Sequence, residues 1–431
     1  MVCICLINNI FHKVAMAIEE AVVLAAGEGK RLRPLTYTRP KCMINLAGKP
    51  ILHHVLDALR EAGAKKAFVI VKYKEDVVKE YFKNKKIGLS IKFITQGEKY
   101  GTAAAFAQAE KHVSSTFFAV AGDVITTPAA LKQLAQGHGG KISALLTEVQ
   151  NPQGYGIASI KDGYIHSFEE KPKAPPKTGF VNCSLYIMEP AIFSSLNKVG
   201  RSTRGEYEMT DVLKTEKVKA IKTDEYWLDM GMPWQLFNAN EFLLSKLPEK
   251  KGKIENCTIK GKIIMQEGAK IINSYVEGVV YIGKNSAIGP HAYIRGTTAI
   301  GDNCSIGDST TIKNSIIFDG VNAKHLAYIG DSIIGEGCNF GAAAQIANYR
   351  FDETSIKAKV NEVVIDTQRK KLGAIIGDKV KMGVLSSVMP GRMIGDSCWI
   401  GAGVIVGENV ERSTHLQLRQ DIKKGKVKQE R

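Results

Sequence analysis

The stretch "YIGKNSAIGPHAYIRGTTAIGDNCSIGDSTTI", residues 281–312, carries an aliphatic residue at every sixth position. Glycine commonly follows that residue, and mostly polar residues fill the rest of each hexapeptide. An α-helix repeats about every 3.6 residues and a half-buried strand about every two, so neither produces this period. The pattern predicts a parallel β-helix, in which each hexapeptide gives one short strand and turn and the aliphatic side chains stack inside.

The same period recurs later in the chain in a different frame. The two sets of aliphatic positions are Ile282, Ile288, Ile294, Ile300, Ile306 and Ile312, then Ile376, Met382, Val388, Ile394, Ile400 and Val406. Ile334, Phe340 and Ile346 share the later frame, so the register slips before Ile334. The stretch "KHLAYIGDS", residues 324–332, lies inside that slip. A second interruption, residues 347–374, is too long for a turn between coils, so we expect it to project as a loop.

The first half of the chain follows another pattern. Between Glu20 and about Leu247, strand-like runs such as "AVVLAAG" and "FFAVAGD" alternate with helix-like segments such as "PILHHVLDALREAG". This alternation predicts βαβ units in a mostly parallel sheet. We therefore expect an α/β domain at 20–247 and a β-helix at 250–415. Residues 1–19 are interpreted as an N-terminal extension, of which 1–15 are either a mis-assigned start or a loose extension, and 416–431 as a basic tail.

The composition restricts the partners. The formal net charge is +16, which favours an anionic partner such as nucleic acid, a membrane surface or a small phosphorylated substrate. Clusters such as "KYKEDVVKEYFKNKK" mix signs and are typical of solvated surface, and no apolar run is long enough for a membrane span. The eight cysteines show no CxxC pair or zinc spacing. We expect reduced thiols, a cytoplasmic location and no nucleic-acid or membrane partner.

The turn after the first strand, "LAAGEGKRLRPLTYTRPK" at residues 24–41, can bind phosphate. Its glycines let backbone N–H groups close around an anion, and Arg31 and Lys41 can neutralise the charge. The turn resembles the signature of the sugar-1-phosphate nucleotidylyltransferases, Gly-x-Gly-Thr-Arg-Leu with a later Pro-Lys pair. Further motifs of that family follow in order: "GKPIL", "QGEKYGTAAA", "AGDV", "NPQGYGIA", "FEEKP", "VNCSLYIM", "GEYEMTD" and "WLDMGMP".

The resemblance implies a Rossmann-like domain in which a sugar-1-phosphate oxygen attacks the α-phosphate of UTP or dTTP and pyrophosphate leaves. It implies Arg31, Lys41 and Asp123 as catalytic residues, with Asp123 and Asp229 as Mg²⁺ ligands. The implied nucleotide-binding residues are Leu24, Ala25, Gly27, Gln96, Gly101 and Thr102, and those for the sugar phosphate are Gly156, Glu170, Lys171 and Asn182. Taken alone, Asp123 could cap a helix and Lys171 could be a solvated loop charge; the ordered set of motifs favours the site.

Three positions depart from this family's pattern. Lys30 replaces the usual Thr or Ser, Ser184 the usual Gly, and Met232 the usual Thr. None of these changes removes an implied metal ligand. They bear on which sugar and which base the protein prefers.

The β-helix carries a second resemblance. "HLAYIGDS" followed by "NFGAAAQIANYRFD" resembles the acetyltransferase half of the bifunctional uridylyltransferase and glucosamine-1-phosphate acetyltransferase. The resemblance implies His325 as the general base, because an ammonium group must lose a proton before it attacks the thioester of acetyl-CoA. It implies Tyr328, Asn339, Asn348, Tyr349 and Lys357 at the amino-sugar phosphate, and Ala342 and Ala402 at acetyl-CoA.

Two positions in this region also depart from the family. Archaeal-type relatives often have a lysine where this chain has Thr354, so Lys357 or the nearby Arg350 would have to supply the anion clamp. Ala343 stands where the family prefers glycine.

The resemblance to the archaeal-type bifunctional enzymes spans about residues 20–415 and implies a left-handed β-helix and a homotrimer. Such an enzyme of UDP-sugar biosynthesis acetylates glucosamine-1-phosphate or galactosamine-1-phosphate. It then transfers UMP or dTMP to N-acetylglucosamine-1-phosphate or glucose-1-phosphate. Two alternatives are a single-activity nucleotidylyltransferase with a structural β-helix and a non-catalytic regulatory subunit. The retained Arg31, Lys41, Asp123 and Asp229 argue against the second alternative.

Overall fold

The structure, a computed structural model, describes residues 17–202 and 204–425. The expected mis-assigned start lies outside the described residues, as does the end of the expected basic tail. The chain divides into two compact units. The first is Met1–Ala26, His54–Lys72 and Tyr81–Leu228, and the second is Gly27–His53, Tyr73–Glu80 and Asp229–Arg431. The loop that follows the first strand therefore groups with the β-helix.

The first unit is built on a nine-stranded sheet. Its strands, in spatial order, are β5 (Ser90–Thr95), β4 (Lys66–Val71), β1 (Glu20–Ala25), β6 (Phe117–Ala121), β11 (Thr178–Met188), β8 (Ile142–Gln150), β12 (Val218–Thr223), β10 (Tyr164–Glu170) and β9 (Gly156–Lys161). The strands from β5 to β6 are parallel, as expected, and so are β8 and β12. The sheet becomes mixed because β11 runs antiparallel to β6 and β8, and β9 and β10 form an antiparallel pair.

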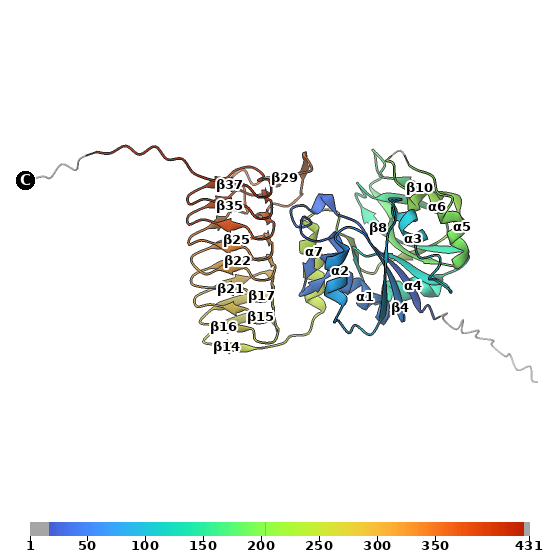
Figure 1. Ribbon diagram of the computed structural model, residues 1–431, viewed down its shortest axis with the longest axis horizontal. Coiled ribbons are helices and arrows are strands. Elements are labelled where there is room, and N and C mark those ends of the chain that lie inside the picture. Colours follow the sequence, from blue (N-terminus) through green and yellow to red (C-terminus); the bar gives the residue numbers. More distant parts are fainter. Residues whose placement is uncertain (1–16, 203, 426–431) are drawn as a thin grey trace, which may run out of the picture. The chain divides into compact units, whose positions relative to one another are not determined.

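The helices and shorter strands of both units are labelled where there is room in Figure 1. The helices are α1 (Ile51–Glu61), α2 (Glu75–Phe82), α3 (Thr102–Ala107), α4 (Pro128–Gly137), α5 (Phe193–Leu196), α6 (Met209–Thr215), α7 (Gln235–Lys246) and the 3₁₀ turns η1 (Lys30–Leu32), η2 (Lys41–Met43) and η3 (Pro190–Ile192). Two small sheets pair β2 (Asn45–Leu46) with β3 (Lys49–Pro50), and β7 (Val124–Thr126) with β13 (Trp227–Asp229). Within the described ranges, none of the helices has the length and apolarity that crossing a bilayer requires.

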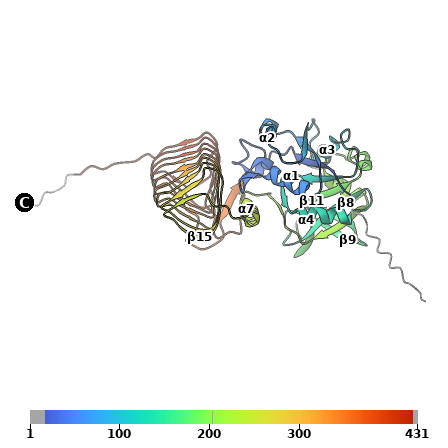
Figure 2. The ribbon, with the colours of Figure 1, turned by 90° about the horizontal axis from the view of Figure 1, so that it is seen from below.

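The second unit contains the β-helix, whose coils stack in one column (Figure 1) and nearly superimpose in the turned view (Figure 2). One ladder of parallel strands is β14 (Lys253–Glu255), β16 (Lys270–Ile272), β18 (Ala287–Ile288), β21 (Ser305–Ile306), β24 (Asn322–Ala323), β27 (Asn339–Phe340), β32 (Lys381–Met382), β35 (Trp399–Ile400) and β37 (His415–Leu416). The arrangement is consistent with the expected left-handed parallel β-helix.

A second group of parallel strands, on the other faces of the coils, forms one continuous sheet. It comprises β15 (Thr258–Met265), β17 (Tyr275–Ile282), β19 (Tyr293–Arg295), β20 (Thr297–Ile300), β22 (Thr311–Lys313), β23 (Ile316–Ile317), β25 (Tyr328–Gly330), β26 (Ile333–Ile334), β28 (Gln345–Ile346), β31 (Ile375–Ile376), β33 (Ser387–Val388), β34 (Met393–Ile394) and β36 (Ile405–Val406). The predicted aliphatic positions of both sets are buried inside the coils.

The frame change arises from two separate one-residue shortenings. Ile282 pairs with Ile300, 18 positions later, but Ile300 pairs with Ile317 and Ile317 with Ile334, each only 17 positions later. The short steps are Ile312 to Ile317 and Ile329 to Ile334, which are five residues long instead of six. The stretch 324–332 thus begins after the first shortening and reaches into the second, and the coil keeps its stacking throughout.

The interruption after Ile346 leaves the column and returns at Ile375, so the expected projecting loop is confirmed. It contains a hairpin of β29 (Lys357–Val360) and β30 (Val363–Asp366). The side chain of Asn409 fastens this hairpin to the coils: its Nδ2 donates to the Lys359 carbonyl at 2.9 Å.

The six cysteines in the described part of the chain are free. Three of them, Cys304, Cys338 and Cys398, lie inside the β-helix among the aliphatic side chains. Burial raises the pKa of the Cys338 thiol to about 12, so at neutral pH it is a protonated, unreactive core residue.

Candidate active sites

The loop Gly27–Lys41, called the glycine loop below, folds back on itself. Gly29 has φ +72°, and a Cβ at this position would lie 2.7 Å from the Lys41 Cβ. The Thr36 hydroxyl donates to the Gly29 carbonyl at 3.0 Å. Glycine is therefore required at position 29, both for its left-handed backbone and for the close approach of Lys41.

Arg31, Lys41 and Asp229 are brought together within the second unit. The Lys41 Nζ lies 3.1 Å from the Asp229 Oδ1. The Arg31 guanidinium lies beside Gly231, 3.6 Å from where a Cβ would stand, and the Gly231 N–H donates to the Asp229 carbonyl at 3.0 Å. Two cations and one carboxylate thus converge, which suits the binding of phosphate groups and a cation. Lys30 is exposed and lies 3.9 Å from Glu28.

Asp123 follows β6 at the carboxyl end of the parallel strands. The N–H of the preceding residue, Gly122, donates to the Leu24 carbonyl at 2.8 Å, which places Asp123 next to the end of β1. The alternative that Asp123 caps a helix is wrong, because α4 is capped by Thr127, whose hydroxyl accepts from the Ala130 N–H at 3.1 Å. Ligands of open α/β sheets bind at this edge of the strands.

The predicted nucleotide-binding residues after β5 are held by the segment 207–209. A Cβ on Gly101 would lie 2.2 Å from the Tyr207 carbonyl oxygen, and the Thr102 hydroxyl accepts from the Met209 N–H at 2.8 Å. Gln96 is 4% exposed, and its amide nitrogen donates to the Lys99 carbonyl at 2.8 Å. The Gln96 amide therefore hydrogen-bonds within its own loop. Its contact with the nucleobase stays a prediction. Leu24 and Ala25 end β1.

The predicted sugar-phosphate residues gather on β9, β10 and β11. Gly156 pairs with Glu170, and a Cβ on Gly156 would lie 2.8 Å from the Glu170 Oε2. The Lys171 Nζ lies 3.6 Å from the Glu170 Oε1. Asn182 lies on β11, which pairs with β9, and its Nδ2 donates to the Tyr186 hydroxyl at 2.6 Å. Ser184, which replaces the family's glycine, has φ +55° at an irregularity of β11, a backbone conformation that glycine adopts without strain.

Arg204 also belongs to this group, although the sequence analysis did not include it. Its Nη2 lies 3.8 Å from the Glu170 Oε1 and 2.6 Å from the Glu208 Oε2. Arg204 directly precedes the motif "GEYEMTD", and this position beside a family motif was the signal available in the sequence. The structure thus adds a second cation, beside Lys171, to the group predicted to bind the sugar phosphate.

We expect Glu208→Gln to destabilise the chain at pH 7 by about 1.5–3 kcal/mol, the usual contribution of hydrogen bonds to a charged group. The Arg204 hydrogen bond lowers the pKa of the Glu208 carboxyl, with help from Ser202. Because its folded pKa lies below its unfolded pKa, the stabilisation is present at neutral pH and is lost as pH falls through the folded pKa. Urea unfolding at pH 7 and in acid measures it; a gap between variant and wild type that persists in acid contradicts the assignment.

Three of the residues implied in acetyl transfer, His325, Ala342 and Ala402, lie along one corner of the coils. The corner residues have φ near +55°, and the series includes His291, Ser309, Leu326, Ala343, Leu385 and, with φ +68°, Gly403. Ala343 donates its N–H to the His325 carbonyl at 3.1 Å, which places His325 and Ala342 on neighbouring coils. Ala402 lies two coils further along this corner. Ala343 adopts the left-handed conformation for which the family's glycine is suited.

Tyr328 and Asn348 meet in a buried polar cluster beside this corner. The Asn348 Nδ2 lies 3.3 Å from the Tyr328 hydroxyl and donates to the Asp331 Oδ2 at 2.5 Å. The Lys313 Nζ lies 3.0 Å from the same oxygen, and the Asn314 Nδ2 donates to the other Asp331 oxygen at 2.8 Å. Asp331 is 3% exposed. Lys313 and Asp331 were not among the predicted residues, although Asp331 closes the motif "HLAYIGD".

The remaining predicted residues have other partners. Arg350 and Thr354 both bind Asp352, where the Thr354 hydroxyl donates to Oδ1 at 2.9 Å; these hydrogen bonds, Arg350 first, lower the pKa of the Asp352 carboxyl. Tyr349 lies at the start of the projecting loop, in reach of the Lys371 ammonium at 5.8 Å from its ring centre. Lys357 begins β29. Asn339 lies on β27, on a different face of the coil from Tyr328.

We expect Gly330→Ala to lower acetyl transfer by up to about 100-fold, because small displacements of positioned groups have effects of this size. The added Cβ would lie 2.6 Å from the Asn348 Nδ2 and 2.7 Å from the Tyr328 hydroxyl oxygen. Coenzyme A release measures the effect, and pyrophosphate release should stay unchanged. Gly407→Ala is the matched control, since no atom lies within 4 Å of its added Cβ. Full acetyl transfer by Gly330→Ala would show that this cluster has no role in it.

The carboxylates fit a magnesium ion that shares its ligands with phosphate. In residues 17–202 and 204–425, no group of three or more His, Cys, Asp or Glu side chains forms a metal cage. Magnesium usually binds through one or two carboxylates, water and substrate phosphates. Asp123 and Asp229 are carboxylates of this type, and Lys41 lies beside Asp229; their role as magnesium ligands stays a prediction.

Three family models match the chain. The nucleotidyl transferase model covers residues 20–246, the GMPPB C-terminal domain model 259–389, and the hexapeptide repeat of succinyl-transferase model 373–408.

Curated relatives match the chain over nearly their whole length. The "Bifunctional protein GlmU" of Methanocaldococcus jannaschii is 40% identical over 94% of this chain and 98% of its own. The "Bifunctional sugar-1-phosphate nucleotidylyltransferase/acetyltransferase" of Sulfurisphaera tokodaii is 37% identical over 91% of this chain and 98% of its own. Among solved structures, a putative glucose-1-phosphate thymidylyltransferase from Bacillus anthracis is 26% identical, with a TM-score of 0.47 over 55% of this chain and 98% of that one.

Proposed function

The chain belongs to the family of bifunctional sugar-1-phosphate nucleotidylyltransferase/acetyltransferases, and we propose that it makes a UDP- or dTDP-sugar from an amino-sugar or sugar phosphate. The β-helix acetylates glucosamine-1-phosphate or galactosamine-1-phosphate with acetyl-CoA. The first domain then transfers UMP or dTMP to the N-acetylated product or to glucose-1-phosphate. In this proposal the nucleotidylyltransferase domain spans residues 20–247 and the acetyltransferase β-helix spans residues 250–415. The observation that carries it is the polar cluster of Tyr328, Asp331 and Asn348, which a purely structural β-helix does not need.

Nucleotidyl transfer requires two anions to be held in line while charge is neutralised. In this proposal Arg31 and Lys41 bind the triphosphate, and Lys171 and Arg204 bind the sugar phosphate. The convergence of Arg31 and Lys41 beside Asp229 supports the first part, and the contacts of Lys171 and Arg204 with Glu170 support the second. Asp123 and Asp229 would hold Mg²⁺, which when bound supplies positive charge to the phosphate oxygens.

Acetyl transfer requires the amine to lose a proton near the thioester carbonyl. In this proposal the exposed imidazole of His325 takes that proton, and Tyr328 and Asn348 orient the sugar. Lys313 supplies the positive charge that the sequence analysis sought near Thr354. Its ion pair with the buried Asp331 fixes its direction and supports this assignment. Acetyl-CoA would lie along the corner that contains Ala342 and Ala402.

We further propose that the chain is a homotrimer. Large apolar side chains are exposed along the corner and an adjacent face of the coils, including Leu326 at 58%, Leu385 at 69% and Ile405 at 68%. Contiguous exposed apolar surface is typical of an interface. Light scattering on the purified chain measures the mass, and a monomer at micromolar concentration would contradict the trimer.

A substrate panel tests the proposed function. Sugar-1-phosphates and amino-sugar-1-phosphates are offered with UTP or dTTP, with and without acetyl-CoA, and pyrophosphate and coenzyme A are measured separately. We expect both products from the same preparation. Pyrophosphate release without any coenzyme A release from either amino-sugar phosphate would favour the alternative of a structural β-helix. The absence of both would favour a regulatory subunit.

A further inference from the structure

Arg39 lies in the glycine loop, two residues before Lys41, yet its charged partners belong to the β-helix part of the second unit. Its Nη2 lies 3.1 Å from the Glu336 Oε2 and pairs with the Asp378 Oδ2. The guanidinium lies 5.2 Å from the centre of the Phe318 ring. Arg39 is only 7% exposed. The Asp378 side chain is buried as well, so removal of Arg39 or Asp378 would leave the other charge buried, whereas the Glu336 side chain is 57% exposed.

Asp378 connects the loop to two coils with one carboxylate. Its Oδ2 accepts from Arg39 and from the Thr38 hydroxyl, the latter at 2.5 Å. Its Oδ1 accepts from the Glu336 N–H at 2.8 Å. Asp378 is 4% exposed. Both oxygens are therefore used, and consecutive residues of the loop converge on one point of the coil. We call Arg39, Asp378 and Glu336 the loop clamp.

The backbone after Arg39 transmits its position to Lys41. Pro40 has a ring-restricted φ of −69°, and its carbonyl accepts from the Met43 N–H at 2.8 Å, which closes η2. Cys42 and Met43 are buried. With so little freedom in this segment, a displacement of Arg39 displaces Lys41, whose Nζ is paired with Asp229.

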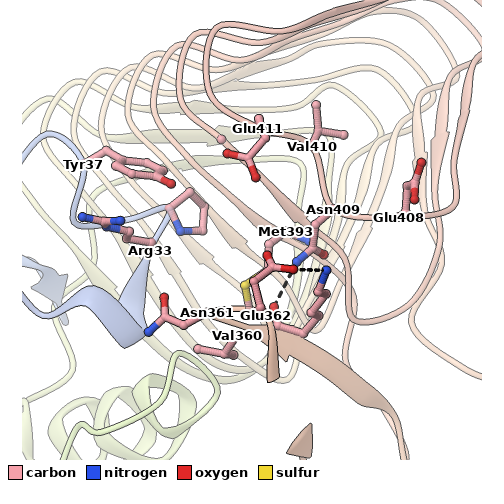
Figure 3. A pocket seen from close by; sticks show the side chains of 13 residues that line it. Arg33, Tyr37, Val360, Asn361, Glu362, Met393, Glu408, Asn409, Val410 and Glu411 are labelled. Carbon is pink, nitrogen blue, oxygen red and sulfur yellow. Dashed lines mark hydrogen bonds and ion pairs between the residues drawn. The ribbon is translucent and has the colours of Figure 1, made fainter. Parts of the chain in front are cut away.

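Beyond the clamp, one side of the loop faces a pocket (Figure 3). A cavity of about 370 Å³ is lined by Arg33 and Tyr37 of the loop, by the hairpin residues 359–362 and by the coil residues 408–411. Arg412 reaches across to within 4.9 Å of the centre of the Tyr37 ring. The loop is also held by the buried Leu32 and Leu35 and by the Tyr73 hydroxyl, which donates to the Thr36 carbonyl at 3.0 Å. On the pocket side, the clamp is the contact that joins the loop to the coils by charge.

We propose that Arg39 is a positioning residue for nucleotidyl transfer. Its pairing with Asp378 and Glu336 holds the glycine loop so that Arg31 and Lys41 meet the triphosphate. This inference rests on the proposed function of the first domain and extends it: the β-helix takes part in the first activity. Glu336 lies three residues before Asn339, so a coil implied in acetyl transfer also holds the loop.

The test uses substitutions on both sides of the clamp in the full chain. Arg39→Ala and Asp378→Asn are expected to lower kcat/KM for pyrophosphate release by about 10- to 100-fold, the size of effect that misplacement produces. Asp378→Asn keeps an oxygen for the Glu336 N–H, so the coil should stay intact. Coenzyme A release should remain within about twofold, and the double variant should be no worse than either single one. Arg39→Lys should recover part of the activity, because an ammonium can still pair with Asp378.

Asp302→Asn is the matched control. Its carboxylate accepts a coil N–H, that of Lys284 at 2.7 Å, as Asp378 accepts that of Glu336, and the glycine loop is not among its partners. It should leave pyrophosphate release unchanged. Equal losses of both activities in Arg39→Ala and Asp378→Asn, or full pyrophosphate release by both, would overturn the proposal.

Amide hydrogen exchange over residues 29–44 gives a readout that needs no activity. Exchange should be faster in Arg39→Ala and Asp378→Asn than in the wild type and in Asp302→Asn. Unchanged exchange in the two clamp variants would overturn the proposal. A wild-type chain that releases no pyrophosphate would instead refute the proposed function, and the exchange rates would still decide whether Asp378 holds the loop.

Discussion

Replacing His325 with alanine is expected to lower coenzyme A release by about 10²- to 10⁴-fold, the usual contribution of a positioned general base. The imidazole lies on the exposed corner of the coil, next to the corner of Ala342 and Ala343. It is also three residues from Tyr328, whose hydroxyl contacts Asn348. Without a base the substrate amine stays largely protonated and cannot attack the thioester. The loss should appear in kcat.

Pyrophosphate release by the same His325→Ala preparation should stay within about twofold of wild type, which excludes misfolding. His291→Asn is the matched control: it removes an exposed imidazole from the same series of corners, and asparagine tolerates its φ of +55°. Undiminished coenzyme A release by His325→Ala would refute its role as the base.

The length of one coil explains how much of the acetyl-transfer site could be predicted. Lys313 and Asp331 are 18 positions apart, and Asp331 and Asn348 are 17 apart, so each pair lies one coil apart. One coil of 17 residues back from Asp331, the last residue of "HLAYIGD", leads to Asn314, and Lys313 directly precedes it. The sequence predicted the anion clamp at Lys357 or Arg350 instead, near Thr354, which lies in the projecting loop and binds Asp352.

The motifs and parallel strands of the first domain could be predicted from the sequence, but the contacts between its distant segments could not. Alternating apolar runs predicted the parallel strands, whereas the antiparallel insertion of β11 depends on pairings between distant segments. Ser184 and Ala343 replace glycines at φ +55° and +57°, which shows that these backbone positions accept a side chain. No period or motif relates Arg39 to Asp378, 339 residues later, so only the folded chain reveals that pair.

Asp123→Asn is expected to lower pyrophosphate release by about 100-fold or more, because a metal ion contributes several kcal/mol to phosphoryl-type transfer. Asparagine keeps the size of the side chain but removes the negative charge that a hard cation requires. Coenzyme A release should be unchanged, since it needs no such ion in the proposed mechanism. Chelation of Mg²⁺ should likewise stop pyrophosphate release and leave coenzyme A release unchanged.

The position of Asp123 makes this prediction specific. It stands at the carboxyl end of β6 beside the end of β1, and Thr127 has the capping role that would otherwise explain an aspartate there. Asp162→Asn is the matched control, because Asp162 occupies a turn of the same unit with φ +52°, which asparagine accepts. The Mg²⁺ concentration for half-maximal pyrophosphate release should rise in Asp123→Asn and not in Asp162→Asn. If both variants respond to Mg²⁺ as the wild type does, Asp123 is not a ligand, and the charge on the phosphates must be neutralised by Arg31, Lys41 and Asp229-bound metal alone.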